Sequence, residues 1–193
     1  MLEALQTLLL STGVVTASEI GDKTMLMAIC LAARFRRPAP IIWGILVATV
    51  LNHAMAGGVG AVLATLITPE ILRWILIVSF AAMAAWMLVP DKLDDEETDE
   101  GRMERFGVFG TTVVLFFLAE MGDKTQLATV ALAAKFPAEA LEVISGTTLG
   151  MMIADAPAVF IGNKLAERLS MKLMRRIAAA VFAILAVAAW LGC

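Results

Sequence analysis

The sequence EIGDKT, at residues 19–24, lies inside a long apolar stretch and returns 101 residues later as EMGDKT, at residues 120–125. Apart from these two motifs, residues 4–33 and residues 106–134 carry no charged side chain. An ionisable group inside a lipid bilayer costs about 2.5–3.5 kcal/mol on insertion scales, and clusters of such groups usually mark an ion or proton pathway. The duplication therefore predicts an intramembrane site made of two similar halves.

The composition of the chain is typical of an integral membrane protein. Of its 193 residues, 60% are hydrophobic and 17% are charged, whereas about a quarter of the residues of a soluble domain are charged. Six apolar segments are each long enough to cross a bilayer about 30 Å thick as a helix. They are residues 5–34, 40–67, 70–89, 106–135, 140–163 and 174–192. We therefore expect an all-α integral membrane protein with six transmembrane helices.

The glycines of the chain predict local features of these helices. The first and fourth segments are longer than a bilayer requires, and each has a glycine inside its acidic motif, which favours a helix that is bent or interrupted there. The second and fifth segments carry further glycines, which permit close helix packing. They are Gly57, Gly58, Gly60, Gly146, Gly150 and Gly162.

The two halves of the chain match beyond the motifs. LAARF at residues 31–35 corresponds to LAAKF at 132–136, and after a shift of one residue Gly44 corresponds to Gly146 and Phe80 to Phe182. This pattern predicts two three-helix repeats, 1–90 and 105–193, joined by an acidic loop at 91–104 that we expect to be flexible. Because each repeat crosses the membrane three times, the second copy must enter from the opposite side, which makes the repeats inverted.

The basic residues predict an orientation. Eleven of the 15 Lys and Arg residues fall on the side of the acidic loop, whereas Arg73 and Lys135 fall on the other side. The positive-inside rule places the eleven in the cytoplasm. Both termini are then expected outside the cytoplasm.

The carboxylates of the motifs predict a cation site. Glu19 and Asp22 are three residues apart and share one face of a helix, as do Glu120 and Asp123. Inverted repeats can bring the two faces together, so that four carboxylates line one cavity. With the two motif lysines the cluster carries a formal charge of −2, which a divalent cation or protons would cancel. We therefore hypothesise an exchange in which protonation from the opposite side displaces the bound metal.

The ligand chemistry indicates a hard cation. Carboxylates and hydroxyls suit Mg²⁺, Ca²⁺ and Mn²⁺, and four neighbouring side chains offer neutral oxygens. These are Ser18, Thr24, Thr125 and Gln126. Met25 and Met121 lie beside motif residues, and a thioether near the site would favour Mn²⁺ over Ca²⁺, although most of the 12 methionines must simply pack.

A structural interpretation of the motifs competes with this one. Glu19 can pair with Lys23, and Glu120 with Lys124, four residues apart on a helix. Such pairs would leave an aspartate of each motif unpaired in the membrane. We therefore favour lysines that tune the carboxylates or hold the empty cavity together.

Polar residues outside the motifs lie at equivalent depth in the second and fifth segments. His53 corresponds to Asp155, and Asn52 is adjacent to His53. Hydrogen bonds to a neighbouring helix are the simplest role for His53 and Asn52. Asp155 is ionisable, so we expect it to serve the pathway, either by relaying protons or by completing the coordination of the cation.

The twin Glu-x-Gly-Asp-Lys-Thr motifs, in two three-helix repeats that an acidic loop separates, resemble the GDT1 family of cation/proton exchangers, which includes bacterial manganese exporters. The resemblance covers essentially the whole chain. It implies Mn²⁺, or else Ca²⁺, as the substrate moved out of the cytoplasm against protons. It makes the motif carboxylates the cation site, with the other motif positions matched as well: Glu19, Asp22, Glu120 and Asp123 for the cation, and Lys23, Lys124, Thr24 and Thr125 beside them.

The resemblance is to the compact prokaryotic form of that family, which implies the inner (plasma) membrane of a bacterium. One departure concerns the residue after each motif, because Met25 stands where the second motif continues into Gln126. The two half-sites are therefore not chemically identical.

Together these features predict a secondary transporter that exports Mn²⁺ by antiport with H⁺. The alternatives are a Ca²⁺/H⁺ exchanger and a passive divalent-cation channel. An enzyme is not expected, since the sequence has no HExxH or GxSxG motif. The sequence also lacks the ATP-binding motif GxxxxGK[ST], so we do not expect transport to be driven directly by ATP. The expected partners are divalent cations, protons and the bilayer, without nucleic acid or a prosthetic group. The sequence leaves open whether the chain forms a homodimer.

Overall fold

Every regular element of the described chain is helical. The computed structural model describes residues 2–86, 88, 100–161 and 171–191. Its elements are α1 (Leu2–Glu19), α2 (Lys23–Phe35), α3 (Pro38–Leu66), α4 (Pro69–Trp86), α5 (Glu100–Glu120), α6 (Lys124–Lys135), the 3₁₀ turn η2 (Pro137–Glu139), α7 (Ala140–Ile161) and α9 (Met171–Leu191). These helices fall on the six apolar segments of the sequence, so the prediction of an all-α protein is confirmed.

The apolar helices are long enough for a membrane protein. Within the described residues, α3, α4 and the segment Pro137–Phe160 can each cross a bilayer by length and composition. A fourth candidate is a bent pair, Phe106–Glu120 with Lys124–Lys135, whose two halves meet at 68°. The structure thus contains three to four candidate spans, and six crossings remain a prediction.

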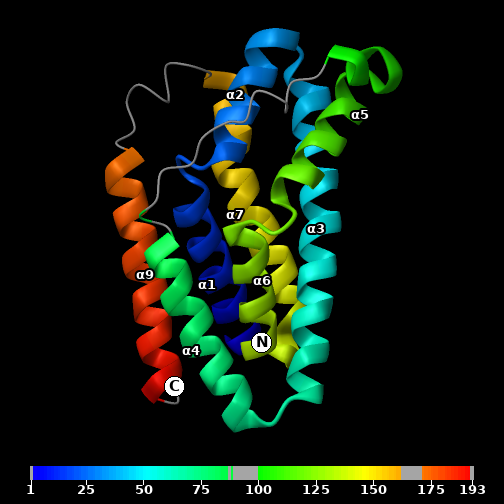
Figure 1. Ribbon diagram of the computed structural model, residues 1–193. Helices are drawn as coiled ribbons and strands as arrows, with labels where there is room; N and C mark the ends of the chain where they lie inside the picture. Colours follow the sequence, from blue (N-terminus) through cyan, green and yellow to red (C-terminus); the bar gives the residue numbers. More distant parts are fainter. Residues whose placement is uncertain (1, 87, 89–99, 162–170, 192–193) are drawn as a thin grey trace.

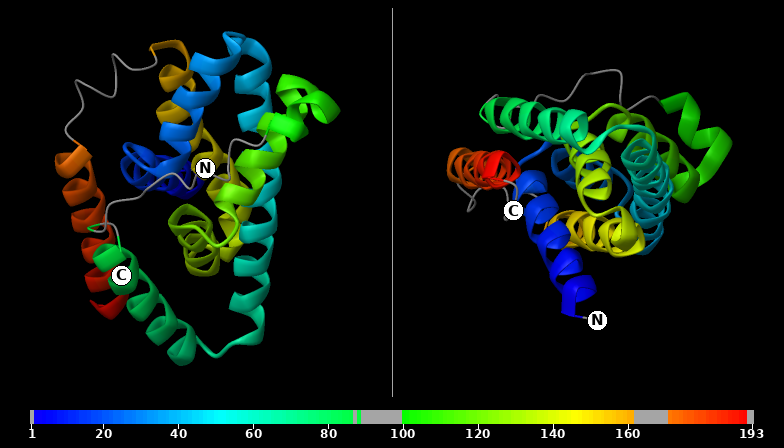
Figure 2. Two further views of the ribbon diagram at one scale, coloured as in Figure 1. Left: turned by 45° about the horizontal axis from the view of Figure 1, so that its top comes forward. Right: turned by 90° about the horizontal axis from the view of Figure 1, so that it is seen from below.

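The helices alternate in direction along the chain. In Figure 1, α1 and α2 run upward, α3 runs downward and α4 upward, whereas α5 and α6 run downward, α7 upward and α9 downward. α4 and α9 lie side by side at one edge of the bundle (Figures 1 and 2). There the Arg73 side chain of α4 donates from Nε to the carbonyl oxygen of Ala189 in α9, at 3.1 Å.

Residues at equivalent positions of the two repeats contact one another. The rings of Phe80 in α4 and Phe182 in α9 stack with their centroids 6.4 Å apart. The Thr49 hydroxyl of α3 lies 2.8 Å from the sulfur of Met151 in α7, and these positions also correspond. Equivalent helices of the two repeats therefore pack against each other, α3 on α7 and α4 on α9.

Close glycine contacts repeat in the same way. A Cβ at Gly44 would lie 2.7 Å from Cβ of Thr112 in α5, and a Cβ at Gly146 would lie 2.9 Å from Cβ of Ser11 in α1. The prediction of close helix packing is confirmed at four of the singled-out glycines, Gly57, Gly60, Gly146 and Gly150. Gly58 has no atom within 4 Å of a built Cβ. Gly162, like residues 91–99 of the acidic loop, lies outside the described residues.

The bundle has an apolar exterior, and its interior combines apolar clusters with buried polar groups. Large apolar side chains cover its outside, among them Trp43, Leu51, Trp74, Val78, Phe160 and Ile184. Its inside holds many polar and charged side chains, among them Glu19, Asp22, Asn52, Glu120, Asp123, Lys124 and Asp155. An apolar exterior suits lipid, and buried ionisable groups in such a protein mark a functional site.

Candidate cation site

Each acidic motif breaks its helix at the glycine. α1 ends at Glu19 and α2 begins at Lys23, while α5 ends at Glu120 and α6 begins at Lys124. Gly21 has a φ of 90° and Gly122 a φ of 77°, in the left-handed region that only glycine adopts without strain. The predicted interruption of both helices is therefore confirmed. The expectation that Glu and Asp share one helical face is wrong, because the break lies between them.

Both aspartates occupy the N-cap of the helix that follows the break. Asp22 has φ/ψ of −80°/172° and Asp123 of −79°/170°, and neither side chain makes a capping hydrogen bond to its own helix. The N-terminal end of a helix carries a partial positive charge that favours nearby anions. The breaks thus place two carboxylates at two helix N-termini, an arrangement that discontinuous helices use for ion binding in transporters.

A threonine steadies the glutamate of each motif. Thr24 donates from Oγ1 to Oε2 of Glu19 at 2.6 Å, and Thr125 donates to Oε2 of Glu120 at 2.7 Å. Both glutamates are fully buried, and within the described part of the chain their second oxygens, Oε1, have no hydrogen-bond partner. Each half-site therefore has a glutamate oxygen that is held in place and another that is available to a ligand.

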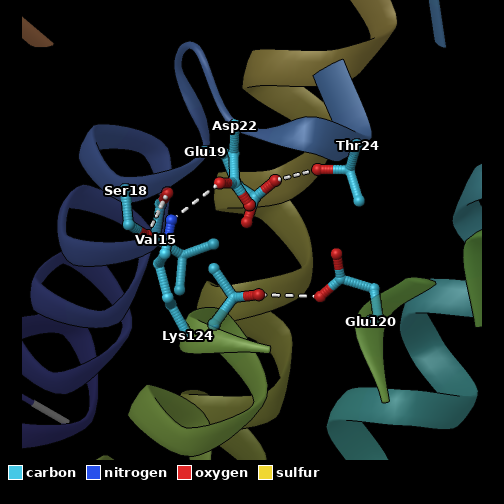
Figure 3. A network of polar contacts seen from close by, with 8 residues as sticks. Val15, Ser18, Glu19, Asp22, Thr24, Glu120 and Lys124 are labelled. Atoms are coloured by element: carbon cyan, nitrogen blue, oxygen red, sulfur yellow. Dashed lines mark hydrogen bonds and ion pairs between the residues drawn. The ribbon is translucent and has the colours of Figure 1, made fainter. Parts of the chain in front are cut away.

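The two motifs meet through an ion pair that joins the repeats. Nζ of Lys124 lies 3.1 Å from Oδ1 of Asp22, and each side chain is only 1% exposed (Figure 3). Nζ of Lys124 also lies 5.9 Å from the centre of the Trp86 ring. The alternative of a Glu–Lys pair within each motif is wrong in this structure, because neither Glu19 nor Glu120 pairs with its own lysine in the described residues.

Two amide side chains brace the second break. Gln126 accepts at Oε1 from the backbone N–H of Gly122 at 2.6 Å, and its Nε2 donates to Oδ1 of Asn52 at 2.7 Å. Asn52 donates in turn to the carbonyl oxygen of Phe117 at 2.9 Å, which confirms its predicted bond to a neighbouring helix. Sequence reasoning offered Gln126 as a donor of neutral oxygen to the cation, whereas here its amide connects α6, α3 and the glycine turn.

Asp155 lies with the motif carboxylates. It is fully buried on α7, and neither of its oxygens has a hydrogen-bond partner among the residues that the structure describes. It is close enough to both Glu19 and Glu120 for mutual repulsion. His53 is also buried, but neither ring nitrogen has a partner in the described chain, so its predicted interhelical hydrogen bond is wrong. The electrostatic neighbours of Glu19 include Asp123 as well as Glu120.

The remaining predicted side chains contribute less to the cluster. The Ser18 hydroxyl donates to the carbonyl oxygen of Val15 at 2.9 Å, one turn back on α1. Met25 is buried, whereas Met121 is 52% exposed. Within the described residues, no group of three or more His, Cys, Asp or Glu side chains stands close enough to hold a metal ion as it is. The carboxylates thus face one region of the bundle without forming a finished cage.

The fold and the site define a class of protein. A bundle with an apolar exterior, several candidate spans and a duplicated buried acidic site on two broken helices belongs to the multi-pass membrane proteins that handle ions. The sequence comparisons specify the family. The family described as "Divalent cation/proton antiporter GDT1" matches residues 7–95 and again residues 108–192. The chain belongs to this family, which confirms the resemblance read from the twin motifs.

Relatives in several organisms agree with this assignment. The chain is 47% identical over 182 residues to a Vibrio cholerae protein described as "Putative manganese exporter", covering 94% of this chain and 88% of that one. It is 30% identical over 203 residues to "GDT1-like protein sll0615" of Synechocystis, covering 91% and 92% of the two chains. No solved structure matches the chain.

Proposed function

We propose that the protein is a secondary transporter that exports Mn²⁺ from the cytoplasm by antiport with H⁺. The observation that carries this proposal is the meeting of the two motifs in one buried place. Asp22 of the first motif contacts Lys124 of the second, and Glu19 faces Glu120 and Asp123. A buried acidic cluster that draws on both halves of the chain suits a divalent cation, and the broken helices suit a carrier.

The cation site in this proposal consists of the four motif carboxylates, Glu19, Asp22, Glu120 and Asp123. Asp155 supports it as a fifth acidic group, which either relays protons or completes the coordination. Thr24 and Thr125 hold the glutamates, and Lys23 and Lys124 balance charge. The net negative charge of this buried cluster favours either a metal ion or protons, and that alternation is the physical basis of an exchange.

The membrane arrangement is part of the proposal. Six segments would cross the inner membrane of a bacterium as two inverted repeats, 1–90 and 105–193, with the acidic loop 91–104 in the cytoplasm and both termini outside. Three observations support it: the family match falls in two blocks, consecutive segments alternate in direction, and equivalent residues such as Phe80 and Phe182 are in contact. Mn²⁺ as the substrate is carried over from the Vibrio cholerae relative.

Purified protein in liposomes that contain a pH-sensitive dye tests this function. We expect an inward Mn²⁺ gradient to drive proton release from the lumen, and Glu19→Gln and Glu120→Gln to abolish both fluxes. Mn²⁺ flux without proton movement would replace the antiporter with a channel or uniporter. Proton movement with Ca²⁺ but not with Mn²⁺ would make the protein a Ca²⁺/H⁺ exchanger.

A further inference from the structure

The ion pair between Asp22 and Lys124 puts an internal cation on a carboxylate of the proposed site. The Lys124 ammonium lies 3.1 Å from Oδ1 of Asp22, and both side chains are 1% exposed. Figure 3 shows the Lys124 side chain reaching up from α6 to Asp22 at the start of α2, beside the paired Glu19 and Thr24. Because an ammonium and a divalent cation repel each other at such short range, they cannot both bind the Asp22 carboxylate without cost.

The second half of the molecule does not repeat this pair. Lys23 and Asp123 stand at the equivalent positions, yet in the described residues neither makes an ion pair or a side-chain hydrogen bond. Lys23 is half-buried, whereas Lys124 is buried. Asp123 is buried at the N-cap of α6, and no lysine of the described residues pairs with its carboxylate as Lys124 does with Asp22. Of two pairings that the repeat permits, the structure holds one, so the Asp123 half-site is open and the Asp22 half-site is occupied.

The surroundings of Lys124 allow its ammonium to leave Asp22. Lysine carries its charge on a flexible four-carbon stem. The Trp86 ring, whose centre lies 5.9 Å from Nζ, offers the ammonium a second favourable contact. The ammonium can therefore give up Asp22 to a metal ion and stay near an attractive neighbour.

We propose that Lys124 is a tethered competitor of the transported cation: its ammonium occupies Asp22 while the site holds no metal, and a divalent cation displaces it. This inference rests on the proposed function and adds a specificity-determining residue to it. The competitor keeps the buried Asp22 charge paired in the empty carrier, since an uncompensated buried charge is strongly destabilising. It also weakens the hold on the metal, which permits release on the far side.

Mn²⁺ binding to the purified, metal-free protein in detergent tests the proposal, with free Mn²⁺ followed by its electron paramagnetic resonance signal. Lys124→Met removes the competitor, so we expect a Kd at least about tenfold lower than that of the wild type, a change equivalent to about 1.4 kcal/mol, together with slower exchange in liposomes. Lys124→Arg strengthens the pairing with a carboxylate, so we expect a higher Kd. Lys135→Met is the matched control: it removes the same charge at the C-terminal end of α6, beside Phe136 and away from the motif carboxylates, so its Kd should stay within about twofold of the wild-type value.

The outcomes separate this inference from the proposed function. A Lys124→Met protein that binds Mn²⁺ no more tightly than the wild type refutes the competitor and leaves the transporter intact. If Lys124→Met does not fold, Lys124→Arg decides, since an unchanged or lower Kd contradicts the proposal. A wild-type protein that binds neither Mn²⁺ nor Ca²⁺ overturns both. A double-mutant cycle of Asp22→Asn and Lys124→Met on thermal stability should show coupling, whereas the cycle of Asp123→Asn and Lys23→Met should be additive.

Discussion

At the break between α1 and α2, the residue after the motif is the buried Met25, whereas at the break between α5 and α6 it is Gln126, whose amide holds the turn and Asn52. The backbone of the two breaks is nearly the same, as the N-cap dihedrals of Asp22 and Asp123 and the positive φ of both glycines show. The motif thus sets the local geometry, and the residues around it differ.

The two breaks thus have the same backbone shape, but their side chains make different contacts. The first break supplies the aspartate that carries the ion pair, and the second break supplies the lysine. The second break is braced to α3 and α5, while the apolar Met25 offers no such hydrogen bonds to the first. The two breaks therefore share a backbone shape but differ in the hydrogen bonds that hold them.

The largest expected effect tests whether the two halves are equally necessary. Glu19→Gln and Glu120→Gln each keep an oxygen that can accept the threonine hydrogen bond while removing one charge from the cation site. We expect each variant to lose at least about 100-fold in Mn²⁺ flux, equivalent to about 2.7 kcal/mol of transition-state stabilisation. Flux into liposomes measures this, with monodisperse elution from a sizing column as the control for folding. A variant that retained full flux would remove its half from the site.

The next largest effect is expected from a substitution that gives the second break the same residue as the first. Gln126→Met copies the residue of the first motif and removes the partner of the Gly122 N–H and of Oδ1 of Asn52, while the Asn52 amide still donates to Phe117. We expect a loss of about 1–3 kcal/mol in stability, the cost of unsatisfied polar groups, measured as a lower thermal midpoint in detergent. Asn52→Ala should act on the same network, so the double variant should cost less than the sum of the two.

Met25→Leu is the matched control for Gln126→Met. It replaces an apolar side chain by one of similar volume, so its cost should stay below about 1.5 kcal/mol. Additive effects of Gln126→Met and Asn52→Ala would show that the two amides do not act together.

Much of this fold follows from the sequence. The apolar segments predict the helices, the motif glycines predict the two breaks, and the close contacts of Gly57, Gly60 and Gly146 follow from small residues in apolar helices. Buried carboxylates in both motifs predict that the motifs share a site, and the pair of Asp22 and Lys124 agrees with that. These features depend on local chemistry that is repeated in the chain.

The parts that sequence reasoning missed depend on contacts between the halves. A helical spacing rule paired Glu19 with Lys23, but the left-handed Gly21 turns the chain and Lys124 arrives from the other repeat. The amide brace had a signal, since Gln126 replaces Met25 and Asn52 stands where the second repeat has Ala154. Only the packing of α3 against α6 shows that these two departures from the repeat are partners.

A smaller effect is expected from the glycine turn itself. In Gly122→Ala the new Cβ meets no atom within 4 Å, so the φ of 77° alone determines the cost. We expect a loss of about 1–2 kcal/mol, the price of a left-handed conformation for an L-residue. Gly58→Ala is the control, because its Cβ also meets open space inside α3, and a helical alanine should stabilise by up to about 1 kcal/mol. Equal thermal midpoints for the two variants would contradict the role of the turn.

The smallest expected difference concerns the threonines. Thr24→Val and Thr125→Val each remove a hydroxyl that donates to a buried glutamate, at 2.6 and 2.7 Å, with little change in volume. Each should lower stability by about 0.5–1.5 kcal/mol, the net worth of a typical hydrogen bond. Because this bond lies within the motif, the two losses should be equal within about 0.5 kcal/mol, the usual scatter for independent sites. Thermal midpoints of the two variants in the same detergent provide the comparison. A clearly larger loss of stability in Thr24→Val than in Thr125→Val would contradict this prediction. It would mean that the different surroundings of the two breaks change the strength of the Thr–Glu hydrogen bond within the motif.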